Sequence, residues 1–303
     1  MATSTDNHDQ TSQSVIAFYK ASHKSYVRVW SGTYDRAIHF GYYDDETAMH
    51  PEALIRMNEL LADLAGIGRE DVVIDAGCGF GGSTVWLAEN RAGKAIGINI
   101  VPHQIAIANE VAQDRGVADR VTFLQADFAN IPIEDGSADV FWALESMVHA
   151  PDRLRVLAEA FRLLKPGGRI VIVEYFLRSD PPLDVATIPH YEDILSGWAM
   201  PSLLTIPDYC QLMHSAGFGS MHAQVLTDNV APSLQRMKKF AAASLVITRP
   251  LAALGLYERA RVAHAQASVA LADAHFAGHF QYAVITAQKP TAMAGFVQSG
   301  VPK

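Results

Sequence analysis

Residues 72–82 read VVIDAGCGFGG, and this stretch decides the fold. A short apolar run ends near Asp75, and glycines follow it in the pattern Gly77-x-Gly79-x-x-Gly82. The pattern predicts a buried strand that turns tightly into a helix, because glycine permits the turn and lets a ligand approach the main chain. Taken alone, the turn is also compatible with a Gly-rich connection that binds nothing.

Short apolar runs alternate with amphipathic helical patterns around this turn, which predicts βαβ units and a parallel sheet covered on both faces. The sequence therefore predicts an α/β fold: a Rossmann-like, doubly wound, mostly parallel seven-stranded sheet with an N-terminal helical lid and a helical cap insertion. Strands are expected at 71–76, 95–100, 120–125, 138–144, 169–176, 218–226 and 280–286. Helices are expected at 81–90, 102–115, 151–164, 206–215 and 233–274, the last with a break at Arg249-Pro250.

The composition favours a folded chain with a large core. Of the 303 residues, 50% are hydrophobic and 18% are charged, against about 25% charged residues in typical domains. The net charge of −8 argues against sequence-independent binding to nucleic acid. Cys78 and Cys210 lie far apart, which argues against a disulfide framework or a zinc site. Without a signal peptide or an apolar run long enough to span a bilayer, a cytoplasmic protein is expected.

Two features argue against a nicotinamide cofactor. Asp75 lies two residues before the first glycine, where a carboxylate can hold a ligand ammonium. The second predicted strand ends in GINI (97–100), so no carboxylate follows to bind the ribose of NAD(P). A P-loop is excluded, because no GKS or GKT follows the glycines. An NAD(P)-dependent Rossmann oxidoreductase stays as the alternative from a different class.

Four further motifs follow the glycine turn in order. They are GINIVPHQ (97–104), QADFANIPIEDGSAD (125–139), WALESMVHAPD (142–152) and LKPGGRIVIVEYF (164–176). Together the five resemble class I S-adenosylmethionine-dependent methyltransferases, in the small-molecule branch of sterol, tocopherol and prenyl C-methyltransferases and natural-product sugar O-methyltransferases. FQYAVITAQK (280–289) is similar to the last strand of that branch. The resemblance implies S-adenosyl-L-methionine as cofactor, S-adenosyl-L-homocysteine as product, and no metal.

The residue pattern and the resemblance together predict a division of the chain. We expect a disordered N-terminus over 1–13, an N-terminal helical lid over 14–66 and a cofactor-binding core over 67–180. Cap helices and the last strands of the same domain follow over 181–290, with a flexible tail over 291–303.

Residue by residue, the resemblance implies a cofactor that spans the carboxyl ends of the first four strands. Its methionine end meets the glycine turn, its ribose meets Asn99 and Gln104, and its adenine meets Asp127 and Phe128. Glu145 closes the pocket near the methyl group. The full implied set is Asp75, Gly77, Gly79, Asn99, Gln104, Asp127, Phe128 and Glu145.

Glu145, His149 and Glu174 follow or end the predicted fourth and fifth strands, where open α/β sheets place their ligands. They are the candidate catalytic residues. The ordinary pKa of histidine, about 6.5, suits His149 to general-base work. Burial at a strand end raises the pKa of Glu145 toward a base's range. Glu174 can orient His149 or accept a proton itself, and a purely structural role is open for each of the three.

Aromatic side chains crowd residues 14–45 and recur after the fifth strand. Their rings suit an apolar, flat or isoprenoid acceptor and stabilise cations, although ordinary packing of a lid is the alternative. The candidate substrate-binding residues are Tyr19, Tyr26, Trp30, His39, Tyr42, Tyr191 and Trp198.

These observations predict a methyltransferase that acts on a hydrophobic small molecule in secondary-metabolite biosynthesis. The aromatic lid favours C-methylation of a prenyl, isoprenoid or aromatic carbon. Val148 favours it too, because it stands where sugar O-methyltransferases often carry a second His. O-methylation or N-methylation of a hydroxyl, sugar or amine stays open, as does an inactive cofactor-binding protein. A homo-oligomer formed through the N-terminal helix or the cap is also expected.

Overall fold

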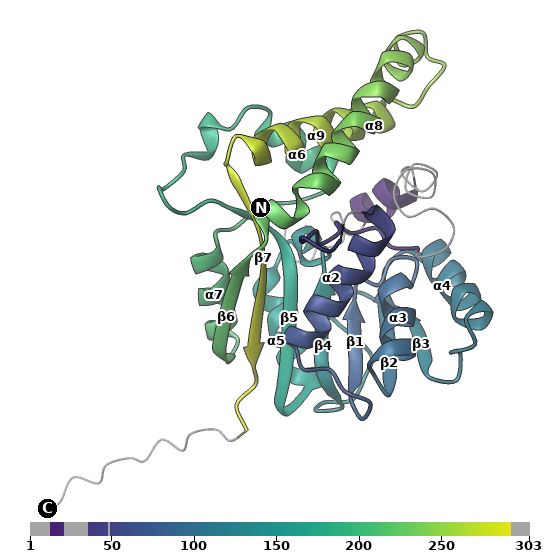
Figure 1. Cartoon of the computed structure of the whole chain (residues 1–303), viewed down its shortest axis with the longest axis vertical. Coiled ribbons are helices and arrows are strands. Elements are labelled where there is room, and N and C mark those ends of the chain that lie inside the picture. Colours follow the sequence, from purple (N-terminus) through teal and green to yellow (C-terminus); the bar gives the residue numbers. More distant parts are fainter. Residues whose placement is uncertain (1–12, 21–35, 48, 292–303) are drawn as a thin grey trace, which may run out of the picture.

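The computed structural model describes residues 13–20, 36–47 and 49–291. Its centre is a seven-stranded sheet with the order β3-β2-β1-β4-β5-β7-β6 (Figure 1). β7 runs antiparallel to β5 and β6, and the remaining pairs are parallel. The predicted fold class is therefore confirmed. The strands are β1 Val72–Ala76, β2 Lys94–Asn99, β3 Val121–Gln125, β4 Ala138–Leu144, β5 Leu164–Leu177, β6 Gly219–Val225 and β7 Phe280–Gln288.

Alternate residues of the central strands feed two cores, one on each face of the sheet. Val73 and Trp142 pack with α2, α3 and α4, whereas Ile74 and Phe141 pack with α5 and α7. This alternation follows from the period of two in a strand and explains the near-continuous apolar runs of the sequence. The covering helices are α2 His50–Leu64, α3 Gly82–Asn90, α4 Pro102–Asp114, α5 Arg153–Leu163 and α7 Ile206–Ser215.

The chain reverses its direction of travel across the sheet between β1 and β4. It moves outward from β1 to β3 on one side and then returns to place β4 beside β1, with Asp75 opposite Trp142. In open α/β sheets the carboxyl ends of the strands at such a switch point leave a crevice for a ligand. The glycine turn after β1 and the residues after β4 therefore face the same opening.

A helical cap stands beyond the carboxyl ends of the parallel strands (Figure 1). It consists of α6 Tyr191–Gly197, α8 Thr227–Ala253 and α9 Arg259–Phe276, and α9 packs on both α6 and α8. The predicted break at Arg249-Pro250 is wrong, because α8 continues through Pro250 to Ala253. Pro250 lacks the N–H that would bond to the carbonyl of Val246, yet the helix continues for three residues beyond it. The helix ends instead before Gly255, whose φ is +73°.

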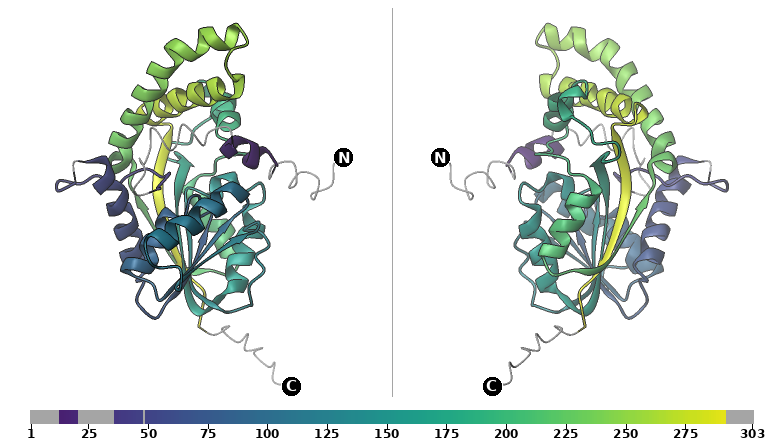
Figure 2. Two further views of the ribbon diagram at one scale, coloured as in Figure 1. Left: turned by 90° about the vertical axis from the view of Figure 1, so that its right-hand side faces the viewer. Right: turned by 90° about the vertical axis from the view of Figure 1, so that its left-hand side faces the viewer.

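The N-terminal part of the chain contributes three separate pieces. Residues 13–20 are helical and lie on the cap side of the sheet (Figure 2). Residues 36–47 run as an irregular segment against α2, where a Cβ on Gly41 would stand 2.6 Å from the Ala53 Cβ. α2 itself packs beside α3 on the face of the sheet. Within the described part of the predicted lid, residues of 13–20 and 36–47 thus lie near the opening.

Some expectations fall on residues that the structure does not describe. Outside the described residues lie 1–12 of the predicted disordered N-terminus and 292–303 of the predicted tail. Tyr26 and Trp30 also lie outside them. Within the described ranges, no helix is long and apolar enough to cross a membrane.

Candidate active site

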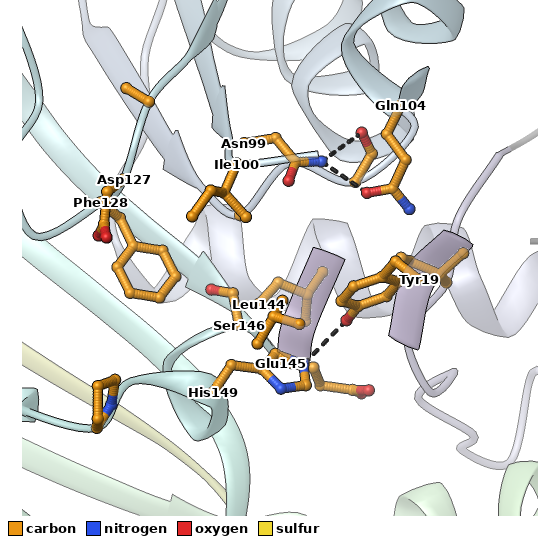
Figure 3. Close-up of a pocket in the computed structure, with 16 residues that line it drawn as sticks. Tyr19, Asn99, Ile100, Gln104, Asp127, Phe128, Leu144, Glu145, Ser146 and His149 are labelled. Carbon is orange, nitrogen blue, oxygen red and sulfur yellow. Dashed lines mark hydrogen bonds between the residues drawn. The ribbon is translucent and has the colours of Figure 1, made fainter. Parts of the chain in front are cut away.

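The cavity that gathers most of the predicted site residues, called the main cavity below, opens at the carboxyl ends of β1 to β4, under the helical residues 13–20 (Figure 3). Each of the four strands supplies part of its wall, as the switch point predicts. It is lined by Val15, Tyr19, Ile38, Gly77, Gly79, Asn99, Ile100, Gln104, Ala126, Asp127, Phe128, Leu144, Glu145, Ser146, His149 and Pro151.

The glycine turn forms one wall of this cavity with its backbone alone. The N–H groups of Gly77 and Cys78 donate to the Ile98 carbonyl at 2.8 and 3.0 Å, which holds the turn against β2. Gly77 has a φ of +99°, and a Cβ there would stand 2.3 Å from the Cβ of Ser146. Ser146 cannot move away easily, because its hydroxyl donates to the Ala76 carbonyl. Only glycine therefore fits at position 77.

Asn99 and Gln104 form a polar pair on the next wall. The Asn99 side-chain amide donates to the Gly79 carbonyl at 3.1 Å and to Gln104 Oε1 at 2.8 Å. The Asn99 oxygen accepts from the Val101 N–H. Gln104 is buried, and its Nε2 has no hydrogen-bond partner among the described residues. A buried amide donor that lines a cavity without a partner fits a polar ligand such as a ribose.

Asp127 and Phe128 form the far end of the cavity, and Figure 3 shows the Phe128 ring turned toward its middle. One oxygen of Asp127 accepts from the Ala129 N–H at 2.8 Å, which fixes the loop. Asp75 does not line the main cavity. It is buried beneath the glycine turn, accepts a bond from the Thr84 hydroxyl at 2.6 Å and faces a small adjoining cavity. Burial raises the pKa of Asp75 to about 7.

Glu145 follows β4 in the left-handed region, with a φ of +53°, a conformation that costs a non-glycine residue energy. Its Oε1 accepts two hydrogen bonds, from the Tyr282 hydroxyl at 2.6 Å and from the Phe40 N–H at 2.8 Å. Burial raises the pKa of Glu145 to about 7. The carboxyl group therefore joins β7, the N-terminal segment and the cavity wall at one point.

His149 lies on the 3₁₀ turn η1 Met147–His149, and both of its ring nitrogens have partners. Nδ1 is 3.1 Å from the Ala199 carbonyl, and Nε2 is 2.9 Å from the Tyr19 hydroxyl. Burial lowers the pKa of His149 to about 4, so the ring is neutral near pH 7. A carbonyl only accepts, so Nδ1 carries the proton and Nε2 accepts from Tyr19. The structure thus presents an unprotonated ring nitrogen to a phenolic hydroxyl.

Glu174, the third predicted catalytic residue, is buried beside η1 and does not line the cavity. Neither ring nitrogen of His149 bonds to it. Burial raises the pKa of Glu174 to about 7, against the opposite effects of Arg153 and of the Val148 N–H. Arg153 donates to the carbonyls of Val148 and Ser202 at 3.3 and 2.6 Å. Glu174 and Arg153 thus hold the backbone that precedes His149, and sequence reasoning missed Arg153.

The predicted substrate-binding residues separate into several places. Tyr19 lines the cavity, and the Trp198 ring lies 6.2 Å from Phe18, the neighbour of Tyr19. His39 faces the adjoining small cavity beside Asp75. Tyr42 and Tyr191 do not line the main cavity, because Tyr42 bonds to α2 and Tyr191 packs on Phe280. Sequence reasoning also missed Tyr282, which reaches Glu145 from the last strand.

Among the described residues, no group of three or more His, Cys, Asp or Glu side chains is arranged to hold a metal ion. The expectation of a metal-free reaction nevertheless stays a prediction.

The chain is similar to known methyltransferases in the region that forms the cavity. A methyltransferase domain model matches residues 74–172. The chloroplastic tocopherol O-methyltransferase of Arabidopsis thaliana is 31% identical over 234 residues, which cover 72% of this chain and 66% of the plant protein. The 27-O-demethylrifamycin SV methyltransferase of Amycolatopsis mediterranei is 33% identical over 196 residues, 65% of this chain and 71% of that protein.

Among solved structures, that of the [4+2]-cyclase SpnF is similar with a TM-score of 0.77 and 26% identity. The match covers 93% of this chain and 97% of SpnF. A cyclase on the same fold shows that the fold alone does not decide the reaction, which depends on the residues of the site.

Proposed function

This chain belongs to the class I S-adenosylmethionine-dependent methyltransferases of the sterol, tocopherol and natural-product type, and from that premise we propose that it methylates a hydroxylated hydrophobic natural product. The bond between His149 Nε2 and the Tyr19 hydroxyl carries this proposal. A hydroxyl group in that position meets an unprotonated ring nitrogen inside the cavity.

The residues of the main cavity fit the cofactor. The partnerless Nε2 of Gln104 supports a ribose contact, and the bare backbone at Gly77 and Gly79 leaves room for the methionine end. Asp127 and Phe128 lie at the opposite end, which suits an adenine ring and its amino group. Bound there, S-adenosylmethionine supplies a methyl group on a positively charged sulfur. A nucleophile attacks the methyl carbon in line, and the sulfur leaves as the neutral thioether of S-adenosylhomocysteine.

His149 is the proposed general base. The Ala199 carbonyl holds its proton on Nδ1, so the lone pair of Nε2 points to the hydroxyl. The acceptor hydroxyl replaces the phenol of Tyr19 on Nε2 and gives up its proton there as the methyl group arrives. A base with a pKa of about 4 acts well only on an acidic hydroxyl, so we propose a phenol or enol as acceptor.

Transfer to carbon is the second candidate. The loss of a phenolic proton places negative charge on ring carbons as well as on oxygen, so the same base serves C-methylation of an aromatic ring. The rings of Phe18, Trp198 and His264 meet at centroid distances of 4.7–6.2 Å and offer a surface for a flat or isoprenoid body. Product analysis by mass spectrometry and NMR separates an O-methyl from a C-methyl product.

A pH profile tests which group is the base. A base must be unprotonated, so activity falls as the pH drops through its pKa. The parameter to measure is kcat/KM for the acceptor, with S-adenosylmethionine saturating at every pH. With His149 as base, it stays level through neutral pH and falls only toward pH 4, where the pKa of His149 lies. With Glu145 as base, the fall comes at higher pH, from about 7 downward, by as much as the sulfonium lowers the pKa of Glu145. Under saturating cofactor, an acid limb well above pH 4 that disappears in Glu145→Gln contradicts our assignment.

The cofactor's charge gives a second test, through Glu145. A bound sulfonium favours the ionised carboxylate, so binding of S-adenosylmethionine is coupled to loss of the Glu145 proton. The pKa of Glu145 is about 7 in the protein without cofactor. Below pH 7, we therefore expect the affinity for S-adenosylmethionine to rise with pH, by up to about tenfold per pH unit.

S-adenosylhomocysteine is the matched control for this measurement, because it has the same ammonium and carboxylate but a neutral sulfur. Calorimetry from about pH 5.5 to 8 should show the ratio of the two affinities rising with pH in the natural protein and staying flat in Glu145→Gln. A flat ratio in both proteins places the sulfonium away from Glu145.

A further inference from the structure

The most exposed large apolar side chains of the described residues gather at one place, the far end of the α8–α9 pair. They are Val246 at 75%, Leu254 at 73%, Leu256 at 71% and Ile247 at 65% exposed. All four lie within eleven consecutive residues. Single exposed apolar residues need no explanation, but such a concentration marks an interaction site.

We call this surface the hairpin tip and define it as Val246, Ile247, Leu254 and Leu256. Ile247 and Leu254, seven residues apart, lie on the outward side of α8 and of its C-cap. Val246 stands on the flank of α8, where it also borders a hollow between α8, α9 and α6. Leu256 follows in the turn to α9. On the inward face, Leu245, Ala252 and Val262 form a small core of their own. The outward leucines are therefore not needed to hold the two helices together.

The hairpin tip is convex and projects away from the sheet (Figures 1 and 2). It stands on the side of the carboxyl ends of the strands, as the main cavity does. α9 also links the two places, since its His264 packs on Phe18 and Trp198 beside the cavity.

Charge on the same helices has the opposite sign from the rest of the protein. Residues 227–276 contain six Lys and Arg against three Asp and Glu, a net charge of +3, whereas the whole chain carries −8. Lys239 and Arg259, both exposed, flank the tip on α8 and at the start of α9, and the exposed Glu258 lies beside Arg259. Apolar side chains bordered by basic residues are typical of segments that lie in the interface of an anionic membrane.

We propose that the hairpin tip docks the enzyme on the surface of a membrane that contains anionic lipids, with the four apolar side chains among the lipid headgroups. The contact is peripheral, since no described helix is long and apolar enough to cross a membrane. A second copy of this chain is a poorer occupant. A symmetric pair would bring two convex tips together, and each would carry the same positive charge.

Docking places the opening of the cavity on the membrane side of the molecule. A hydrophobic acceptor partitions into lipid, so a docked enzyme meets it at its own surface. This last step rests on the proposed function, whereas docking itself does not, and the two are measured separately below.

Co-sedimentation with vesicles tests the proposal on the full chain. The natural protein should pellet with vesicles of phosphatidylcholine mixed with phosphatidylglycerol, and much less with phosphatidylcholine alone. Leu254→Ser/Leu256→Ser should lower the partition coefficient by about tenfold or more, because two apolar side chains no longer enter the lipid. Lys239→Glu/Arg259→Glu should remove the preference for phosphatidylglycerol, and about 1 M salt should do the same.

Met49→Ser/Leu64→Ser is the matched control, because these side chains are 61% and 41% exposed at the start and the end of α2, outside the hairpin tip. It should pellet like the natural protein, and all variants should bind S-adenosylhomocysteine unchanged, which shows that they are folded. Three results overturn docking: no pelleting of the natural protein, equal loss in the control, or a Leu254→Ser/Leu256→Ser variant that turns a dimer into a monomer. None of them depends on whether the enzyme methylates a hydroxyl.

Discussion

His149→Gln is expected to lower kcat by about 10²–10⁴-fold while leaving the affinity for S-adenosylhomocysteine nearly unchanged. The reason is the fixed tautomer: the Ala199 carbonyl keeps the proton on Nδ1, so only Nε2 can take a proton from the acceptor. Glutamine offers no basic nitrogen. Single-turnover rates, measured together with calorimetric binding of S-adenosylhomocysteine, separate the chemical step from cofactor binding.

Two further variants sharpen this result. In His149→Asn, the amide can still donate to Ala199, so a loss as large as in His149→Gln shows that proton transfer, and not the tether, is missing. In Tyr19→Phe, the hydroxyl that competes for Nε2 is removed, so kcat should change far less. Near-normal turnover of His149→Gln would mean that the reaction proceeds by positioning alone.

Asp127→Ala should weaken the binding of S-adenosylmethionine and of S-adenosylhomocysteine equally, by about 1.5–3 kcal/mol or roughly 10–150-fold. The two ligands share their adenosine, and Asp127 lies at the end of the cavity proposed for the adenine. An equal loss distinguishes this carboxylate from Glu145, whose effect depends on the sulfonium. Titration calorimetry with both ligands gives the comparison directly.

Asp127→Asn separates the ligand contact from the local fold. The asparagine oxygen can still accept from the Ala129 N–H and from an adenine amino group, so its loss should be smaller than that of alanine. Glu134→Ala, an exposed carboxylate farther along the connection from β3 to β4, should change nothing. Unchanged affinity in Asp127→Ala would move the adenine to another wall of the cavity.

The strands were predictable because their signals are local, and so was the meeting of most residues proposed for the cofactor at one cavity. A buried parallel strand is a short apolar run, and the glycine turn is contiguous with β1, so 72–82 indicates both. β4 and α7 have the predicted bounds, 138–144 and 206–215. The residues after β1 to β4 meet because parallel strands bring their carboxyl ends to one edge.

The partners of the catalytic candidates were not predictable, because they come from distant parts of the chain. Tyr282 reaches Glu145 across 137 positions, and Arg153 meets Ser202 from 49 positions away. Tyr282 stands in an apolar strand and Arg153 in an amphipathic helix. The sequence around them carries no signal that distinguishes either from an ordinary structural residue. The path of α8 through Pro250 was equally hidden, since the low helix propensity of proline predicts a break there and α8 ends only at Ala253.

The place of β7 in the sheet has a consequence for synthesis of the protein on the ribosome. This strand is the last in the chain, yet it lies between β5 and β6 and pairs with β5 from Arg169 to Leu177. A nascent chain that has released the glycine turn and five strands therefore still exposes the whole edge of β5, which is open to pairing with other chains. Glu145 also lacks the Tyr282 hydroxyl until residues 280–288 have emerged. Chains that stop before residue 280 should therefore aggregate during translation rather than accumulate as a folded core.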